Sequence, residues 1–282
     1  MTGSPVPAGR DKMMLVLLPF ILIGLGASVG ICLAAGFGGV LLAGMLVALT
    51  AACAVAALVL FVAVLGLFSL FIDTDKPQEE PNTFCRRAVC YVMGILTALS
   101  RIRLHVSGTE LLPREGTWLL VCNHRSNYDP IVTGWALRRC NLAFISKPQN
   151  MHIPIAGRFI YKAGYLGIDR DNDRAALRTI LLAAKRLKEG RCSYAIYPEG
   201  TRSHGTEMLP FRNGALKIAQ KAGVPIVVAA VRGTEQVAKR APWRATDVTL
   251  TICRVMDAET VTASKTTELG EEIRQCILSA NT

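Results

Sequence analysis

A histidine and an aspartate five positions apart form the first pair in this sequence that could carry out acid–base chemistry. His124 and Asp129 follow the short apolar run 118–122. That run predicts a buried strand. Asp129 and Pro130 predict a helix start, because an aspartate accepts hydrogen bonds from the first free amides and the fixed φ of proline suits the first helical position. His124 is therefore expected in a strand-to-helix turn.

A turn at this point could bring the imidazole of His124 and the carboxylate of Asp129 together. The carboxylate would then fix the tautomer of the ring and stabilise the imidazolium that forms when the histidine takes a proton, which is what a general base requires. A plain alternative is an ordinary loop in which Asp129 only caps a helix, because short patterns have a high false-positive rate.

Basic and polar residues follow the ends of three further predicted strands. In an α/β sheet, ligands gather beyond the carboxyl ends of the strands, so these positions are candidates for a binding site. Guanidinium groups suit phosphate because their planar donors pair with two oxygens at once. The candidates are Lys147 after strand 142–145, Arg170 after strand 165–168, and Glu199, Gly200, Thr201 and Arg202 after strand 193–197.

The N-terminal part of the chain predicts a membrane anchor. Residues 13–72 contain no charged residue and no histidine, whereas one span needs only roughly 20 residues. This apolar stretch is too long for a secretory signal. A turn at 36–39 would give two spans, at about 13–35 and 40–71, although three shorter spans would also fit. Basic residues near both ends of the stretch favour an even number of spans with both ends cytoplasmic.

The charge balance points to an anionic partner. Only Arg10, Asp11 and Lys12 are charged in the first 72 residues, so nearly all of the formal net charge of +11 belongs to the region after the membrane. A basic domain at a cytoplasmic leaflet would be attracted to anionic lipid or to a phosphate-bearing substrate. We expect no nucleic acid partner, because no recognition motif is present. Nine cysteines without paired spacing favour reduced thiols over disulfides or a metal site, and Cys122 is expected to be a core thiol.

The remainder of the chain alternates between predicted strands and helices, which is typical of an α/β sheet. We therefore predict an anchor at 1–72, a linker at 73–83 and an α/β domain at 84–282. Strands are expected at 103–106, 118–122, 142–145, 165–168, 193–197, 225–231 and 247–252, and helices at 84–100, 130–138, 155–163, 173–189, 214–222 and 268–278.

Four blocks of this sequence together resemble the glycerolipid acyltransferases, specifically the 1-acylglycerol-3-phosphate (lysophosphatidic acid) acyltransferases. The blocks are residues 123–129, 164–170, 198–203 and 224–227, and their order and spacing agree with the family. Two positions depart from the usual pattern, since Gly167 replaces a bulky aromatic residue and Val228 replaces a second proline. The resemblance implies a mixed-sheet α/β acyltransferase domain behind a transmembrane helical hairpin.

The resemblance also implies a reaction and its residues. His124, supported by Asp129, would take the proton of the free hydroxyl of lysophosphatidic acid as that oxygen attacks an acyl thioester. The donor would be acyl-CoA or an acylated carrier protein, and the product phosphatidic acid, with no cofactor or metal. Site residues around the acceptor would be Arg170, Glu199, Gly200, Thr201 and Arg202, with Lys147, Asn123 and Ser126 as further candidates.

The expected location is an integral membrane protein of the bacterial inner membrane or the endoplasmic reticulum, with its site on the cytoplasmic face. Three alternatives stay open on the sequence: a different lysophospholipid or lyso-aminolipid acceptor, a lipid hydrolase that activates water, and a non-enzymatic membrane scaffold. The hydrolase lacks a G-x-S-x-G motif. The sequence leaves the oligomeric state open.

Overall fold

The computed structural model describes residues 14–36, 39–74 and 80–281. The chain separates into two compact units, with the division between Asp73 and Thr74. Three predicted features lie wholly or partly outside the described residues: the basic residues Arg10 and Lys12, the middle of the turn at 36–39, and residues 75–79 of the predicted linker.

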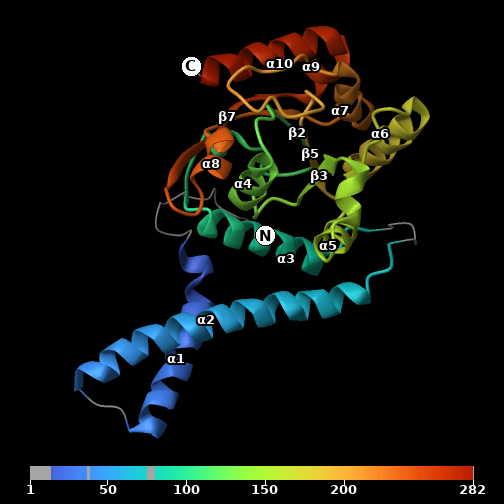
Figure 1. Ribbon diagram of the computed structural model, residues 1–282. Coiled ribbons are helices and arrows are strands. Elements are labelled where there is room, and N and C mark those ends of the chain that lie inside the picture. The colour runs from blue at the N-terminus through green and yellow to red at the C-terminus, as the bar shows by residue number, and fades with distance from the viewer. Residues whose placement is uncertain (1–13, 37–38, 75–79, 282) are drawn as a thin grey trace. The chain divides into compact units, whose positions relative to one another are not determined.

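The first unit is a pair of long apolar helices, α1 (Leu18–Ala35) and α2 (Gly39–Leu70), preceded by a short 3-10 helix at Met14–Val16 (Figure 1). Gly36 ends α1 with a φ of 67°, a conformation that glycine adopts without strain. The two helices approach closely at Gly24, where an added Cβ would lie 2.5 Å from the carbonyl oxygen of Thr50. Both helices are long and apolar enough to cross a membrane, and most of their side chains are not buried against protein.

The second unit is built on a seven-stranded sheet with the strand order β1-β7-β6-β2-β5-β3-β4. Strands β2 to β6 are parallel to one another, whereas β7 runs antiparallel to β6, and β1 runs parallel to β7. The sheet is therefore mixed, as the resemblance implies. The strands are β1 (Ile102–Ser107), β2 (Leu119–Cys122), β3 (Leu142–Ser146), β4 (Leu166–Gly167), β5 (Ser193–Ile196), β6 (Ile226–Arg232) and β7 (Thr246–Met256).

Helices pack on the sheet in two groups (Figure 1). The first group is α3 (Thr83–Leu99), α4 (Tyr128–Ala136) and α5 (Ala156–Lys162). The second group is α6 (Asp173–Lys188), α7 (Lys217–Ala222), α9 (Ala258–Ala263) and α10 (Thr266–Asn281). The short α8 (Val237–Arg240) lies in the connection from β6 to β7. Central strands β2, β5 and β6 are buried on both faces, which explains their continuous apolar runs.

Side-chain caps start two of the predicted helices. Asn82 accepts a hydrogen bond from the amide of Cys85 at the start of α3, and Asn172 accepts one from Ala175 at the start of α6. Each cap satisfies an amide that has no partner inside the helix. Gly190 follows α6 with a φ of 69°, which agrees with the predicted left-handed ending.

The structure corrects several predicted boundaries. The strand expected at 165–168 is only Leu166–Gly167, because β4 is an edge strand that pairs with β3 alone. The helix expected at 214–222 starts as a 3-10 turn at Asn213–Leu216 before α7. β7 continues to Met256, four residues beyond its predicted end, and pairs with both β1 and β6. The helix α9 is missing from the prediction, because it is too short for a periodic apolar pattern.

Candidate active site

The parallel strands β2 to β6 place their carboxyl ends at one edge of the sheet, which we call the carboxyl edge. At the end of β2, the buried side chain of Asn123 fixes the chain to its neighbour β6. Its Nδ2 donates to the carbonyl oxygen of Val231 at 2.9 Å, and its Oδ1 accepts from the amide of Val231 at 2.8 Å. Both ends of the amide are thus engaged by backbone, so Asn123 positions the following turn.

His124 and Asp129 meet within this turn. The distance from His124 Nδ1 to Asp129 Oδ2 is 2.7 Å, and the aspartate side chain is fully buried while that of His124 is 17% exposed. A carboxylate accepts hydrogen bonds, so Nδ1 carries the proton and Nε2 is left as the basic nitrogen. The sequence interpretation that a turn would join these two groups therefore agrees with the geometry.

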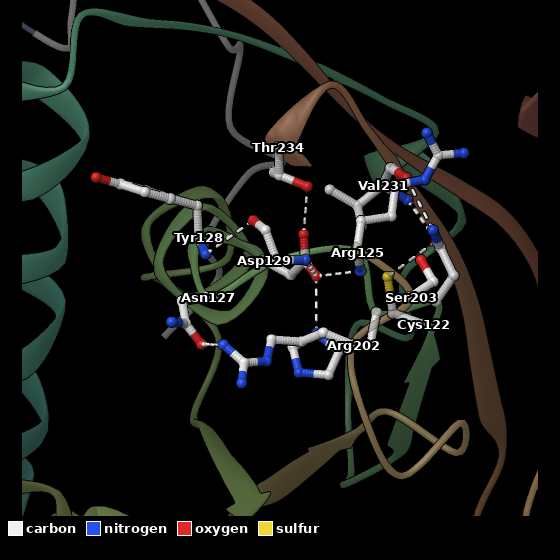
Figure 2. Close-up of polar contacts among 12 residues, drawn as sticks. Cys122, Arg125, Asn127, Tyr128, Asp129, Arg202, Ser203, Val231 and Thr234 are labelled. Atoms are coloured by element: carbon white, nitrogen blue, oxygen red, sulfur yellow. Dashed lines mark hydrogen bonds and ion pairs between the residues drawn. The ribbon is translucent and has the colours of Figure 1, made fainter. Parts of the chain in front are cut away.

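Three further donors surround the carboxylate of Asp129 (Figure 2). Oδ2 accepts from the amides of Arg125 at 2.6 Å and Ser126 at 2.7 Å, and Oδ1 accepts from the hydroxyl of Thr234 at 2.5 Å. The predicted role of Asp129 as the helix cap is wrong, because α4 already begins at Tyr128 and the carboxylate turns back to amides that precede the helix. Both oxygens of this buried carboxylate are therefore engaged by donors of the chain.

The ring of His124 lies on the ring of Tyr197 at the end of β5. Their centroids are 4.4 Å apart with an angle of 21° between the planes. Burial raises the pKa of the Tyr197 phenol well above its ordinary value, so this ring stays neutral. Cys122 is also buried, and burial raises the pKa of its thiol well above the ordinary value. It is therefore unsuited to act as a nucleophilic thiolate.

Glu199 joins the loop after β5 to the loop after β2. Its Oε1 accepts from the amide of His124 at 2.6 Å, and its Oε2 accepts from the amide of Leu209 at 2.8 Å. The amide of Ser203 adds a 2.9 Å bond to the carbonyl oxygen of His124. Glu199 is only 5% exposed. With both oxygens bound to backbone amides, Glu199 holds the two loops together.

Arg202 and Thr201, from the same loop, lie nearer the solvent. Arg202 Nη1 donates to Asn127 Oδ1 at 2.8 Å, which places its guanidinium beside the turn that carries His124 (Figure 2). Thr201 is exposed. Gly200, which precedes them, has a φ of 74°, a conformation that favours glycine.

Another arginine, Arg212, which is not among the predicted site residues, lies over Gly200. The nearest atoms to a Cβ added at Gly200 would be Nε and Cδ of Arg212, at 2.9 and 3.1 Å. Burial, and then the like charge of Arg212, lower the pKa of the half-buried Arg170 guanidinium. Neither Arg170 nor Arg212 has a carboxylate within ion-pair distance in the described part of the chain. Two guanidinium groups in this arrangement leave positive charge that an anion could balance.

Two predicted site residues are placed differently. Lys147 is exposed at the carboxyl end of β3, ahead of a 3-10 helix at Pro148–His152. The hydroxyl of Ser126 accepts from the amide of Tyr128 at 3.1 Å, so its contact is local. Gly167, where the resembled family has an aromatic residue, packs so closely on Pro148 that an added Cβ would lie 3.1 Å from its Cα.

Thr234 and Arg212 are the site residues that the sequence reasoning missed. Thr234 follows the end of β6, so the same rule that selected the other strand ends could have found it. Beside it, Glu235 faces the buried Arg125 at 3.6 Å and holds the β6–β7 connection against the turn. Arg212 is separated from β5 by a long loop, and no spacing in the sequence connects it with Gly200.

Comparisons with known proteins identify sequences and a fold similar to those of this chain. Residues 103–232 match the family model described as Acyltransferase. A 1-acyl-sn-glycerol-3-phosphate acyltransferase of Salmonella typhimurium is 37% identical over 144 residues, which cover 51% of this chain and 58% of that relative. A protein of the same name from Saccharomyces cerevisiae is 27% identical over 201 residues, covering 70% of this chain and 65% of the relative.

The chain thus spans little more than half the length of the bacterial relative. Among solved structures, the 1-acyl-sn-glycerophosphate (LPA) acyltransferase PlsC of Thermotoga maritima superposes with a TM-score of 0.59 at 20% identity, covering 96% of this chain and 95% of that one. At that identity the likeness shows a shared fold. Together, the family match, the relatives and the shared fold show that residues 103–232 of this chain are similar to the acyltransferase family.

Proposed function

We propose that this protein transfers an acyl chain from an acyl thioester to the free hydroxyl of lysophosphatidic acid and so forms phosphatidic acid for phospholipid synthesis. The observation that carries the proposal is the 2.7 Å contact between His124 and the buried Asp129 at the carboxyl edge. The names of the bacterial and yeast relatives support the choice of acceptor.

In the proposed reaction, Nε2 of His124 removes the proton of the acceptor hydroxyl as its oxygen attacks the thioester carbonyl. The new ester C–O bond forms, the C–S bond breaks, and the leaving thiolate takes the proton from the imidazolium. Asp129 stabilises the imidazolium while it exists, because its carboxylate is already oriented by backbone amides. No acyl-enzyme is required, since the thioester is already activated and both substrates are held side by side.

The acceptor phosphate is assigned to the arginines beyond β4 and β5. Arg212 lies over Gly200 and its charge acts on Arg170, while Arg202 lies beside the turn of His124. Glu199 orders the loop through its two backbone bonds and does not contact phosphate directly in this proposal. Lys147 and Thr201, both exposed, remain candidates for weaker contacts.

Helices α1 and α2 are proposed to anchor the enzyme in a membrane, with the site on the cytoplasmic face. This placement suits the chemistry, because the lysolipid stays in the leaflet and a water-soluble thioester, either acyl-CoA or an acylated carrier protein, reaches it from the cytoplasm. The reaction as written needs no cofactor.

The deciding experiment measures transfer of a labelled acyl group from acyl-CoA to lysophosphatidic acid by the full chain in bilayers. His124→Ala should lower the rate by about 100- to 10,000-fold, because general-base catalysis contributes about that much. His105→Ala is the matched control, since His105 is an exposed histidine of β1 whose side chain bonds Asp247 at 2.9 Å, away from the turn of His124. Near-normal transfer by the His124 variant would defeat the mechanism.

Parallel reactions separate the alternatives. Transfer only to lysophosphatidylcholine or to a lyso-aminolipid would keep the mechanism and change the acceptor. Label that appears only as free fatty acid would indicate a hydrolase. No consumption of acyl-CoA or of an acylated carrier protein with any acceptor would indicate a scaffold.

A further inference from the structure

The connection between α8 and β7 exposes a tryptophan within a group of basic side chains. Trp243 is 84% exposed, the largest exposure of any large apolar side chain in the described ranges. Lys239, Arg240 and Arg244 are close to Trp243 in the sequence, and all three are exposed to solvent. Arg101, which follows α3, contacts the backbone of Trp243. We call these five residues the Trp243 patch.

Backbone contacts hold the Trp243 patch in a defined place. Arg101 Nη1 donates to the carbonyl oxygen of Trp243 at 3.1 Å, and the amide of Thr246 donates to the carbonyl oxygen of Arg101 at 3.2 Å. The amide of Arg244 bonds the carbonyl oxygen of Arg240 at 2.8 Å. The indole is therefore presented by a connection that is bonded at both ends.

Positive charge on the patch is not balanced by neighbouring carboxylates. Within the described ranges, none of its four cations has an ion pair. Asp247, the nearest acidic residue along the chain, already faces Arg103 at 3.8 Å and His105 at 2.9 Å. The patch thus combines a large apolar side chain with four free positive charges.

The sheet topology places this patch at the same edge as the candidate active site. β2 and β6 are parallel, with Cys122 opposite Ala229, so both strands end at the carboxyl edge. β7 is antiparallel to β6 and therefore begins there, with Thr249 opposite Arg232. β1 begins beside it, with Ile102 opposite Thr246. The tryptophan and His124 consequently flank the same edge of the sheet.

We infer that the Trp243 patch rests in the headgroup region of a leaflet that contains anionic lipid. Indole rings are enriched at this depth, because one part of the ring is apolar and its N–H remains hydrated. Lysine and arginine side chains near an anionic leaflet each add attraction. With its carboxyl edge against the leaflet, the domain holds His124 where a lipid substrate presents its headgroup.

Charge favours a bilayer over a second copy of the chain as the occupant of the patch. Two such patches brought together would bring eight cations into one interface, since each carries four, and like charges across an interface oppose association. An anionic leaflet, in contrast, supplies both the negative surface and the apolar boundary that the indole needs.

Tryptophan fluorescence of the full chain in lipid nanodiscs tests the inference without reference to catalysis. The chain has three tryptophans, of which Trp118 is buried and Trp135 is stacked on Arg138. The difference in emission between wild type and Trp243→Phe therefore isolates Trp243. In nanodiscs of phosphatidylglycerol and phosphatidylcholine with brominated acyl chains, this difference should be quenched relative to unbrominated nanodiscs.

Two other outcomes would overturn the inference. Absence of bromine quenching would place the indole in water. A change in emission that depends on protein concentration but not on bromine would assign the patch to a second copy of the chain. Either result leaves the proposed transfer reaction standing, and a failed acyl transfer assay leaves the quenching result readable.

A charge reversal gives the matched functional measurement. Arg240→Glu/Arg244→Glu should raise the KM for an acceptor embedded in anionic bilayers by about fivefold or more. The reason is that the attraction of one basic residue to such a surface already corresponds to about a fivefold factor in affinity. Its KM for a short-chain acceptor in solution should not change. Lys217→Glu/Lys221→Glu is the control, since both lysines are exposed on α7, whose end leads into the opposite end of β6. Equal effects of the two double variants would show that net charge alone, and not this patch, matters.

Discussion

Asp129 and Arg170 follow two strands, β2 and β4, that end at the same edge of the sheet, yet their side chains meet different surroundings. Asp129 is fully buried and accepts hydrogen bonds from Thr234 and from two amides as well as from His124. Arg170 is half-buried, its pKa is lowered by burial and by the like charge of Arg212 and partly restored by Asp171, and neither arginine forms an ion pair among the described residues. In the proposed function, His124 and Asp129 form a catalytic half that is already bonded within the chain, and Arg170 and Arg212 form an arginine half whose positive charge an anionic ligand would balance.

This difference follows from the chemistry proposed for each half. A base must already be oriented when the substrate arrives, because reorganisation during the reaction would add to the barrier. An acceptor site must bind and release a charged headgroup in every turnover, so its cations cannot be neutralised by permanent partners. Variants of the two halves should therefore affect different kinetic parameters.

The largest effect is expected for Asp129→Asn. The amide keeps the shape of the side chain but loses the charge that stabilises the imidazolium of His124. We expect kcat to fall by about 100- to 10,000-fold, with the acceptor KM little changed. Steady-state kinetics at saturating thioester measure both values. The control is Glu207→Gln, which neutralises an exposed carboxylate in the loop that contains Leu209. A raised acceptor KM with normal kcat would remove Asp129 from the catalytic half.

Arg212→Ala should have the next largest effect, on the acceptor KM. A hydrogen bond to a charged group contributes about 1.5–3 kcal/mol, so we expect an increase of about 10- to 100-fold while kcat changes little. Lys217→Ala serves as the control for loss of one exposed charge. The KM of the thioester is measured in parallel, because CoA also carries phosphate. A selective rise in that value would reassign the arginine pair to the donor.

The comparison also explains what the sequence could and could not predict. His124 and Asp129 were found because a short spacing in one turn already limits their separation. Arg170 and Arg202 were found because strand ends of a parallel sheet converge. Arg212 was missed because its position depends on the path of the loop 198–212, which no periodicity encodes.

Glu199 illustrates a different limit of sequence reasoning. Its place after β5 brings it to the turn of His124, but both its oxygens bind backbone amides, so its contact with the acceptor stays a prediction. In the fold, the central strands were predicted from their apolar runs, whereas the two-residue β4 and the short α9 depend on tertiary contacts.

Thr234→Val is expected to have a smaller effect within the catalytic half. It removes the 2.5 Å bond to Asp129 while keeping the shape of a fully buried side chain. A typical hydrogen bond contributes about 0.5–1.5 kcal/mol, so kcat should fall by about 3- to 10-fold, and Thr234→Ser should restore it.

Rescue by serine distinguishes this role from mere packing. Thr234→Ser keeps the hydroxyl that bonds Asp129 but removes a methyl group, whereas Thr234→Val keeps the shape and removes the hydroxyl. A kcat that falls equally in both variants would assign Thr234 to packing alone.

Glu199→Gln should give the smallest effect, and its sign depends on pH. Burial, although opposed by two backbone amides, raises the pKa of the Glu199 carboxyl above its ordinary value. Between the unfolded and the folded pKa, the folded chain therefore binds more protons at this residue than the unfolded chain, and stability decreases as pH rises. Glutamine cannot titrate. The Tm of wild type minus the Tm of the variant, measured in detergent, should therefore decrease from pH 4 to pH 7. An increase of this Tm difference with pH would mean that the amides of His124 and Leu209 outweigh burial and hold the carboxylate of Glu199 charged. The two oxygens of Glu199 would then be as firmly bonded by their donors as those of Asp129.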